Sequence, residues 1–132
     1  ITQLGGEKAG IMWHGRVKRQ DLIDTAKECS WWSYPTQFCE TFCITALEQQ
    51  LAGNIPITSK LAGLGEVVGA KNLLIYGWPN NDTYKKDWLA TLDSLRNAPS
   101  EEIQDIRMIG KKHAEQYTWD KAYDIWRKAV VS

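Results

Sequence analysis

The chain lacks an excess of charge of either sign, a long apolar run and a paired set of cysteines. Its 132 residues hold 16 Lys and Arg against 16 Asp and Glu, so no net charge draws it toward nucleic acid or an anionic membrane. No apolar stretch approaches the roughly 20 residues that span a bilayer. The three cysteines, Cys29, Cys39 and Cys43, fit neither a disulfide framework nor zinc-site spacing, and they indicate reduced thiols in a cytosolic protein.

The N-terminus also lacks an initiator methionine and the layout of a signal peptide. The opening ITQLGGEKAG therefore indicates an excised domain or a processed fragment. The length predicts a single domain over residues 1–132, large enough to bury roughly two thirds of its unfolded surface.

What the chain does contain is an alternation of short apolar runs and segments with helical periodicity. The expected strands are residues 11–14, 31–34, 55–58 and 72–76. The expected helices are residues 19–28, 41–52 and 64–68, then one capped by Asn81 or Asp82 and ended by Pro99, one capped by Ser100, and one capped by Thr118.

This order of elements predicts an α/β fold, Rossmann-like, with three α/β/α layers around a small parallel sheet of about four strands. Two to three helices end the chain after the last strand, which indicates part of a larger α/β protein. Trp88, Trp119 and Trp126 lie on helical stripes that are expected to pack into the core. Trp78, between Gly77 and Pro79, is the expected exposed aromatic.

The most informative segment is ETFCITALE, in which Glu40 and Glu48 stand eight positions apart. Glu40 is expected where a buried strand ends and Glu48 two turns into the next helix, at the edge where open α/β sheets bind ligands. A rise of 1.5 Å per residue separates the two by about 12 Å, so they cannot share one proton or one metal ion. The amides of residues 41–44 suit a diphosphate, and carboxylates accept hydrogen bonds from vicinal hydroxyls. The residues alone leave two interpretations open, a nucleotide-sugar site and ordinary surface glutamates.

Several motifs in order resemble the C-terminal domain of retaining, GT-B-fold glycosyltransferases of family 4. They are HGRV, the PT turn, ETFCITALE, LAGNIPITS, LAGLGEVV and a helical tail that starts at Thr118 and Trp119, and together they cover about residues 11–130. The resemblance implies the donor-binding half of a GT-B enzyme, without its first strand or strands and without the N-terminal acceptor domain. The full enzyme, a group 1 glycosyltransferase, would move a sugar from a nucleotide diphosphate sugar to an acceptor with retention, and this fragment alone would be inactive.

Carried over by position, the resemblance implies that Glu40 is the catalytic carboxylate, which contacts the donor sugar hydroxyls, and that Glu48 holds the ribose hydroxyls. The other implied donor-binding positions face the diphosphate and sugar (Phe42, Cys43, Ile44 and Thr45) or the nucleobase (Gly15, Arg16 and Val17).

The resemblance further implies no cofactor and no metal, since the departing diphosphate helps to deprotonate the acceptor. The implied partners are the nucleotide-sugar donor and the absent acceptor domain, with no nucleic acid and no transmembrane segment. The implied location is the cytoplasm, either free or at the inner face of a membrane.

The chain departs from the family at several points. Cys43 stands where the family usually has Gly, and Gln49 where it usually has Ala. The family's basic residues that neutralise the diphosphate would lie upstream of residue 1, although Lys60 is a candidate for a phosphate contact. These departures keep a second hypothesis open, a non-catalytic binding or assembly module. A third hypothesis, another Rossmann-like nucleotide-binding protein, lacks any G-x-G-x-x-G or Walker motif.

Overall fold

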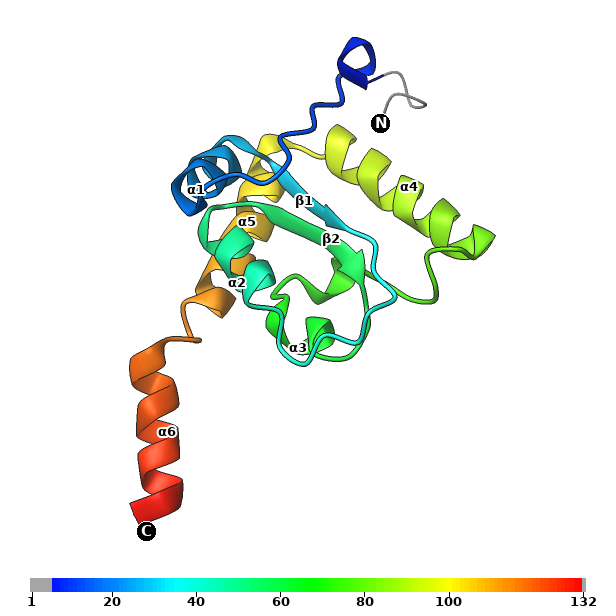
Figure 1. Cartoon of the computed structure of the whole chain (residues 1–132). Helices are drawn as coiled ribbons and strands as arrows, with labels where there is room; N and C mark the ends of the chain where they lie inside the picture. The colour runs from blue at the N-terminus through cyan, green and yellow to red at the C-terminus, as the bar shows by residue number, and fades with distance from the viewer. Residues whose placement is uncertain (1–5, 132) are drawn as a thin grey trace.

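A computed structural model describes residues 6–131, and within them three strands alternate with helices (Figure 1). Residues 1–5 of the opening ITQLGGEKAG, together with Ser132, lie outside the described residues. The elements in chain order are η2 (Gly6–Ala9), α1 (Arg19–Glu28), β1 (Trp31–Tyr34), α2 (Ile44–Leu51), β2 (Ile55–Ser59), α3 (Leu64–Val67), η3 (Lys71–Leu73), β3 (Leu74–Ile75), α4 (Asp82–Asn97), α5 (Ser100–Ala114) and α6 (Trp119–Val131).

The strands form one parallel sheet in the order β1-β2-β3. Trp31 pairs with Ile55, and Thr58 pairs with Leu74. Parallel neighbours need a crossover between them, which α2 supplies from β1 to β2 and α3 with η3 supply from β2 to β3. All five residues of β2 are buried, as expected for a central parallel strand covered on both faces.

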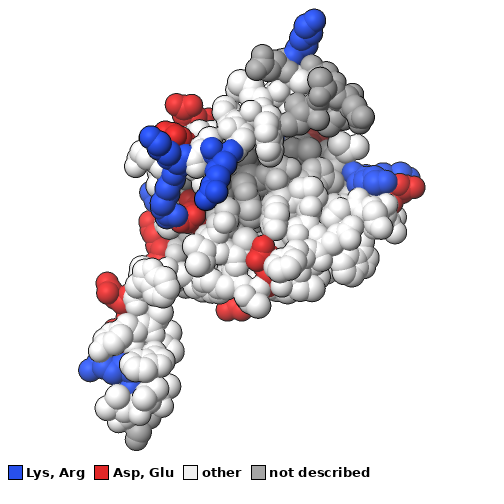
Figure 2. Space-filling view, viewed as in Figure 1, with Lys and Arg blue, Asp and Glu red and all other residues white. Residues whose placement is uncertain are grey.

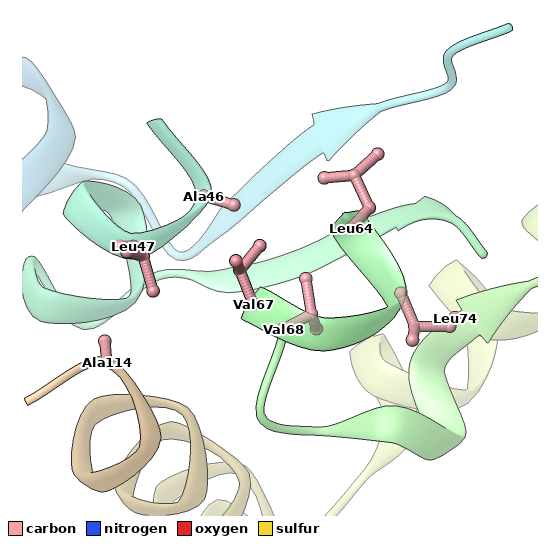
Figure 3. Packing of buried hydrophobic residues seen from close by; sticks show 7 residues of the cluster. All are labelled: Ala46, Leu47, Leu64, Val67, Val68, Leu74 and Ala114. Atoms are coloured by element: carbon pink, nitrogen blue, oxygen red, sulfur yellow. The ribbon is translucent and has the colours of Figure 1, made fainter. Parts of the chain in front are cut away.

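Apolar clusters cover the two faces of this sheet. The first, called here the α2–α3 cluster, lies between α2, α3 and the end of α5 (Figure 3) and consists of Ala46, Leu47, Leu64, Val67, Val68, Leu74 and Ala114. The second, called here the α4 cluster, consists of Ile55, Ile57, Ala70, Leu73, Ile75, Tyr84 and Leu95. Trp31 packs against the α4 cluster and Trp32 against the α2–α3 cluster, so these neighbouring residues of β1 point to opposite faces, as their alternation along a strand predicts. The three-layer arrangement is consistent with the Rossmann-like prediction.

The prediction of a strand at residues 11–14 is wrong. This segment has no regular structure, and Met12 and Trp13 are 69% and 76% exposed. Within residues 6–131, β1 pairs only with β2, and residues 11–14 do not join its other edge. The sheet therefore has three strands in the described residues, where about four were expected.

The helices largely follow their periodicity, with α1 at the predicted bounds and α2 shorter than predicted. α2 begins at Ile44 instead of residue 41, because Cys43 adopts a left-handed conformation that the helix cannot include. The predicted strand at residues 72–76 is reduced to Leu74–Ile75, since the 3-10 turn η3 occupies the residues before it.

The last helix, α6, projects away from the rest of the structure (Figure 1). Its predicted cap is confirmed, since the Thr118 hydroxyl accepts a hydrogen bond from the Lys121 amide at 3.3 Å. The expected burial of its apolar stripe is wrong, because Trp119 and Trp126 are 85% and 59% exposed. No residue of α6 is buried against the described part of the chain. In the same range of residues, no helix is both long and apolar enough to cross a membrane.

A buried amide, that of Gln50, joins three helical segments beneath the sheet. Its Nε2 donates to the carbonyl oxygens of Ala46 and Val67, each at 2.9 Å, and its Oε1 accepts from the Gly69 amide at 2.8 Å. A Cβ added to Gly110 of α5 would lie 3.3 Å from the same Oε1, so α5 packs closely on this group. The Gln50 side chain thus satisfies backbone groups in α2 and around α3 that packing removes from water.

We expect Gln50→Leu to lower the free energy of unfolding by about 3 kcal/mol, because it leaves the Val67 carbonyl and the Gly69 amide without a partner. Urea denaturation measures the change. The control is Gln104→Leu on the exposed surface of α5, which should stay within about 0.5 kcal/mol of the parent. Equal stability of the two variants would contradict the assigned role of Gln50.

Candidate functional site

The loop that carries Glu40 leaves the carboxyl end of β1 and is tied to the end of the neighbouring strand β2. The Ser59 hydroxyl donates to the Thr36 carbonyl at 2.7 Å and accepts from the Thr36 amide at 3.1 Å. The Thr58 hydroxyl donates to the Tyr34 carbonyl at 2.8 Å. These bonds replace the ladder after Pro35, whose nitrogen has no hydrogen to donate. The loop therefore starts from a fixed position at the edge of the sheet.

A third hydroxyl, that of Tyr84 in α4, joins this network from the face of the sheet that the α4 cluster covers. It lies 2.8 Å from Ser59 Oγ. Because the single hydroxyl hydrogen of Ser59 is directed to Thr36, Tyr84 is the donor in this bond. Burial raises the pKa of the Tyr84 phenol, so the group stays neutral and able to donate.

The loop that carries Glu40 also contacts the loop after β2, where Gly63 packs directly against the backbone at Glu40. The Gly63 amide donates to the Glu40 carbonyl at 2.8 Å. A Cβ at Gly63 would lie 2.5 Å from the carbonyl oxygen of Thr41 and 2.8 Å from that of Glu40, which no side chain tolerates. The glycine-rich loop after β2 thus holds the loop after β1 through a contact that only glycine permits.

The Glu40 side chain is half-buried and has one protein partner in the described residues. The Tyr34 hydroxyl donates to Glu40 Oε1 at 3.0 Å. Glu40 lies in the loop before α2, since that helix begins only at Ile44. The estimate of about 12 Å along one helix axis therefore does not describe its separation from Glu48.

Glu48 lies within α2 and is paired with a residue that the sequence did not suggest. Arg19 Nη2, on the first residue of α1, lies 2.6 Å from Glu48 Oε1. The side chains are 75% and 42% exposed, so this pair contributes at most about 1 kcal/mol to stability. Lys and Arg side chains gather over α1 and the segment before it (Figure 2).

The segment expected to meet a nucleobase runs directly into α1. Gly15, at φ +62°, makes the turn that precedes Arg16 and Val17, and all three residues are exposed. Since Arg19 contacts Glu48, this segment ends beside α2. Among the described residues, the Arg16 side chain forms no hydrogen bond or ion pair. No such interaction therefore holds this segment against Glu48.

The four predicted positions from Phe42 to Thr45 lie at the start of α2, as expected. Cys43 precedes the helix with φ 54° and ψ 73°, the left-handed region that glycine favours. This conformation accounts for the glycine that the family usually has at this position. Burial raises the pKa of the Cys43 thiol, and the nearby Glu40 charge acts in the same direction, so the thiol is a poor nucleophile.

The side chains of Phe42 and Ile44 turn away from this backbone segment. They line an apolar pocket of about 320 Å³, shared with Tyr117 before α6 and with Trp119 and Ile125 of α6. Phe42 meets the Tyr117 ring edge to face, with centroids 5.5 Å apart. Any donor contact at these positions would therefore come from the backbone.

Two lysines lie near the glycine-rich loop. Lys60 donates to the Tyr76 hydroxyl and lies 4.5 Å from the centroid of that ring, so its charge is engaged in the described structure. Lys71 donates to the carbonyl oxygens of Gly65 and Glu66 at 2.6 and 2.7 Å, and burial lowers its pKa.

The exposed side chain of Trp78 was predicted from the sequence, and it is 53% exposed in the structure. Within the described part of the chain, no three His, Cys, Asp or Glu side chains form a group that could hold a metal ion.

Three residues that contact Glu40 or Glu48 were not predicted from the sequence. Arg19 and Tyr34 were missed because their partners are 29 and 6 positions away, beyond any helical or strand periodicity. The contact of Gly63 with the backbone of Glu40 is a tertiary one, which the local sequence does not reveal. For Tyr34, its position at the end of β1 beside Pro35 was the available signal.

No family model matches the chain. A D-inositol 3-phosphate glycosyltransferase of Rhodococcus erythropolis is 31% identical over 101 residues, which is 72% of this chain and 22% of that protein. A protein of the same name from Rhodococcus jostii is 28% identical over 105 residues, 78% of this chain and 22% of that protein. The chain spans about a fifth of the length of the curated relatives it matches. Their names support glycosyl transfer as a general class of function.

We expect Gly63→Ala to lower the free energy of unfolding by about 2 to 3 kcal/mol, since the added methyl group meets the Glu40 and Thr41 carbonyls. Amide NMR shifts should move across the Glu40 loop. The control is Gly65→Ala, whose Cβ meets only Lys60 Cγ at 3.9 Å and which should be neutral or slightly stabilising within α3. Similar losses in both variants would refute the close contact at Gly63.

We expect Cys43→Gly to be more stable than Cys43→Ala by about 1 kcal/mol, because only glycine removes the Cβ from a left-handed residue. Both variants lose the same thiol, so the comparison isolates the backbone term. Urea denaturation measures the difference. A more stable alanine variant would show that the residue leaves the left-handed region in solution.

Proposed function

We propose that this chain is the donor-binding domain of a glycosyltransferase that uses a nucleotide diphosphate sugar. The observation that carries the proposal is the placement of Glu40 and the start of α2 together at the carboxyl edge of the sheet. This is the edge at which open α/β folds bind nucleotides. The likeness to D-inositol 3-phosphate glycosyltransferases supports the same class of chemistry.

In this proposal the two carboxylates bind opposite parts of the donor. Glu40 Oε2 has no hydrogen-bond partner within the described residues, so it is available to accept a sugar hydroxyl. Glu48 uses Oε1 for Arg19 and retains Oε2 for the ribose. Arg19 thereby keeps the Glu48 carboxylate facing α1 and the segment that precedes it.

The diphosphate lies between them at the start of α2. The amides of Ile44 and Thr45 belong to the first turn, where an α-helix has no internal acceptor for its N–H groups. Those amides and the positive end of the helix dipole attract an anion. The backbone of residues 15–17 approaches the nucleobase from the other side, and Lys60 reaches the phosphates if it leaves Tyr76.

The whole protein would transfer the sugar with retention, in the cytoplasm and without a metal. The departing diphosphate would take the acceptor proton on the same face of the sugar, so this domain need not supply a base. An acceptor domain outside this chain would provide the second substrate. The chain matches only about a fifth of the length of its relatives, which supports the proposal of such a further domain.

A specific observation favours the second candidate, a non-catalytic module on the same fold. The half-buried Cys43 side chain occupies the position where backbone would approach the diphosphate most closely. If that side chain blocks the anion, the fold remains but nucleotide binding is lost. Cys43→Gly should then create nucleotide affinity that the parent lacks.

We expect Glu48→Gln to weaken binding of both UDP-glucose and UDP about tenfold, while Glu40→Gln weakens only UDP-glucose by that factor, since hydrogen bonds to charged groups contribute about 1.5 kcal/mol or more. GDP-mannose with GDP and ADP-glucose with ADP are tested in parallel, and NMR titration of the 132-residue chain gives each Kd. Glu101→Gln on exposed α5 is the control and should change nothing.

The parent should bind one of the three nucleotide pairs, with shifts at residues 15–17, 40–45 and 48. Absence of binding to all of them, or parent-like affinity in both glutamate variants, would overturn the proposed donor site.

A further inference from the structure

We infer that Tyr34 is a positioning residue for the sugar-contacting carboxylate of Glu40, an inference that rests on the proposed function. Tyr34 ends β1, and its hydroxyl donates to Glu40 Oε1 at 3.0 Å across the turn made by residues 35–39. In the described residues, this hydroxyl is the one hydrogen-bond partner of the Glu40 side chain.

The tyrosine is itself held from two directions. Its ring stacks on Trp32 with centroids 5.0 Å apart and planes inclined by 25°, and both rings pack against the α2–α3 cluster. Its backbone carbonyl accepts from the Thr58 hydroxyl at 2.8 Å. A tyrosine has only two side-chain torsions, and here packing restricts both. The hydroxyl therefore presents a fixed donor at the edge of the sheet.

Glu40 needs such a donor because its own backbone lies in a loop. The Gly63 amide fixes the Glu40 carbonyl at 2.8 Å, but three side-chain torsions separate that backbone from the carboxylate oxygens. The Tyr34 bond immobilises Oε1 and leaves Oε2 to accept a ligand hydroxyl. Restricting the carboxylate before binding removes an entropic cost that would otherwise reduce affinity.

Burial alone does not require this hydrogen bond. Tyr34 and Glu40 are both only partly buried, so each polar group could be satisfied by water. Loss of the Tyr34 hydroxyl should consequently cost little stability while it changes recognition of the sugar. This difference separates a positioning role from a structural one.

The test compares Tyr34→Phe with the parent for binding of UDP-glucose against UDP, and of GDP-mannose against GDP and ADP-glucose against ADP, by NMR titration of the 132-residue chain. Phenylalanine keeps the stacking on Trp32 and removes only the donor. We expect the sugar nucleotide to bind about tenfold more weakly while the Kd of the free diphosphate stays the same. Tyr123→Phe on exposed α6 is the matched control and should alter neither value.

A second comparison places Tyr34→Phe in the Glu40→Gln background. If Tyr34 acts through the carboxylate, the double variant should lose little more sugar-nucleotide affinity than Glu40→Gln alone. Additive losses would overturn the positioning role, as would unchanged sugar binding in Tyr34→Phe. Equal weakening of sugar nucleotide and free diphosphate would assign Tyr34 a structural role and also overturn it.

The same titrations separate this inference from the function on which it rests. A parent chain that binds no nucleotide overturns the donor site and the role of Tyr34 with it. A parent that discriminates the sugar nucleotide through Glu40 while Tyr34→Phe behaves like the parent leaves the donor site standing and removes only the positioning role.

Discussion

Burial of the central strand β2 is the constraint on which the rest of the structure depends. All five of its residues are buried, and Ile55 and Ile57 belong to the α4 cluster. Apolar burial stabilises this strand, but its last two residues, Thr58 and Ser59, are polar and need partners. They find them in the chain that leaves β1, so the need to satisfy buried hydroxyls at the end of β2 decides where the neighbouring loop begins.

The candidate site follows from that arrangement in two further steps. Gly63 brings the loop after β2 into contact with the backbone of Glu40, at a distance that excludes every side chain. Tyr34, anchored in the sheet, then reaches the Glu40 carboxylate. A rigid scaffold thus carries a loop residue whose backbone and side chain are both held. Such support is what a carboxylate needs if it is to select among hydroxyls by geometry.

The resemblance to glycosyltransferases bears on two features of Cys43, its left-handed backbone and its side chain. The left-handed backbone at Cys43 is natural for the glycine expected there, and a cysteine accepts it only at some cost in strain. Its side chain also brings a half-buried thiol close to the start of α2. Sequence likeness covers most of this chain but only about a fifth of the length of each relative.

The sequence by itself determined the helices with clear periodicity, the two longer strands, and the positions of Glu40 in the loop after a strand and of Glu48 in the helix that follows. Local signals such as the Thr118 cap and the alternation of Trp31 and Trp32 are encoded within a few residues, which is why they were predictable. The irregular state of residues 11–14 and the exposure of α6 depend instead on contacts with segments distant in the sequence, which the described residues do not supply. The same holds for the contacts of Arg19, Tyr34 and Gly63 with the two glutamates. Only the tertiary structure decided these features, because each requires two separate segments to meet in space.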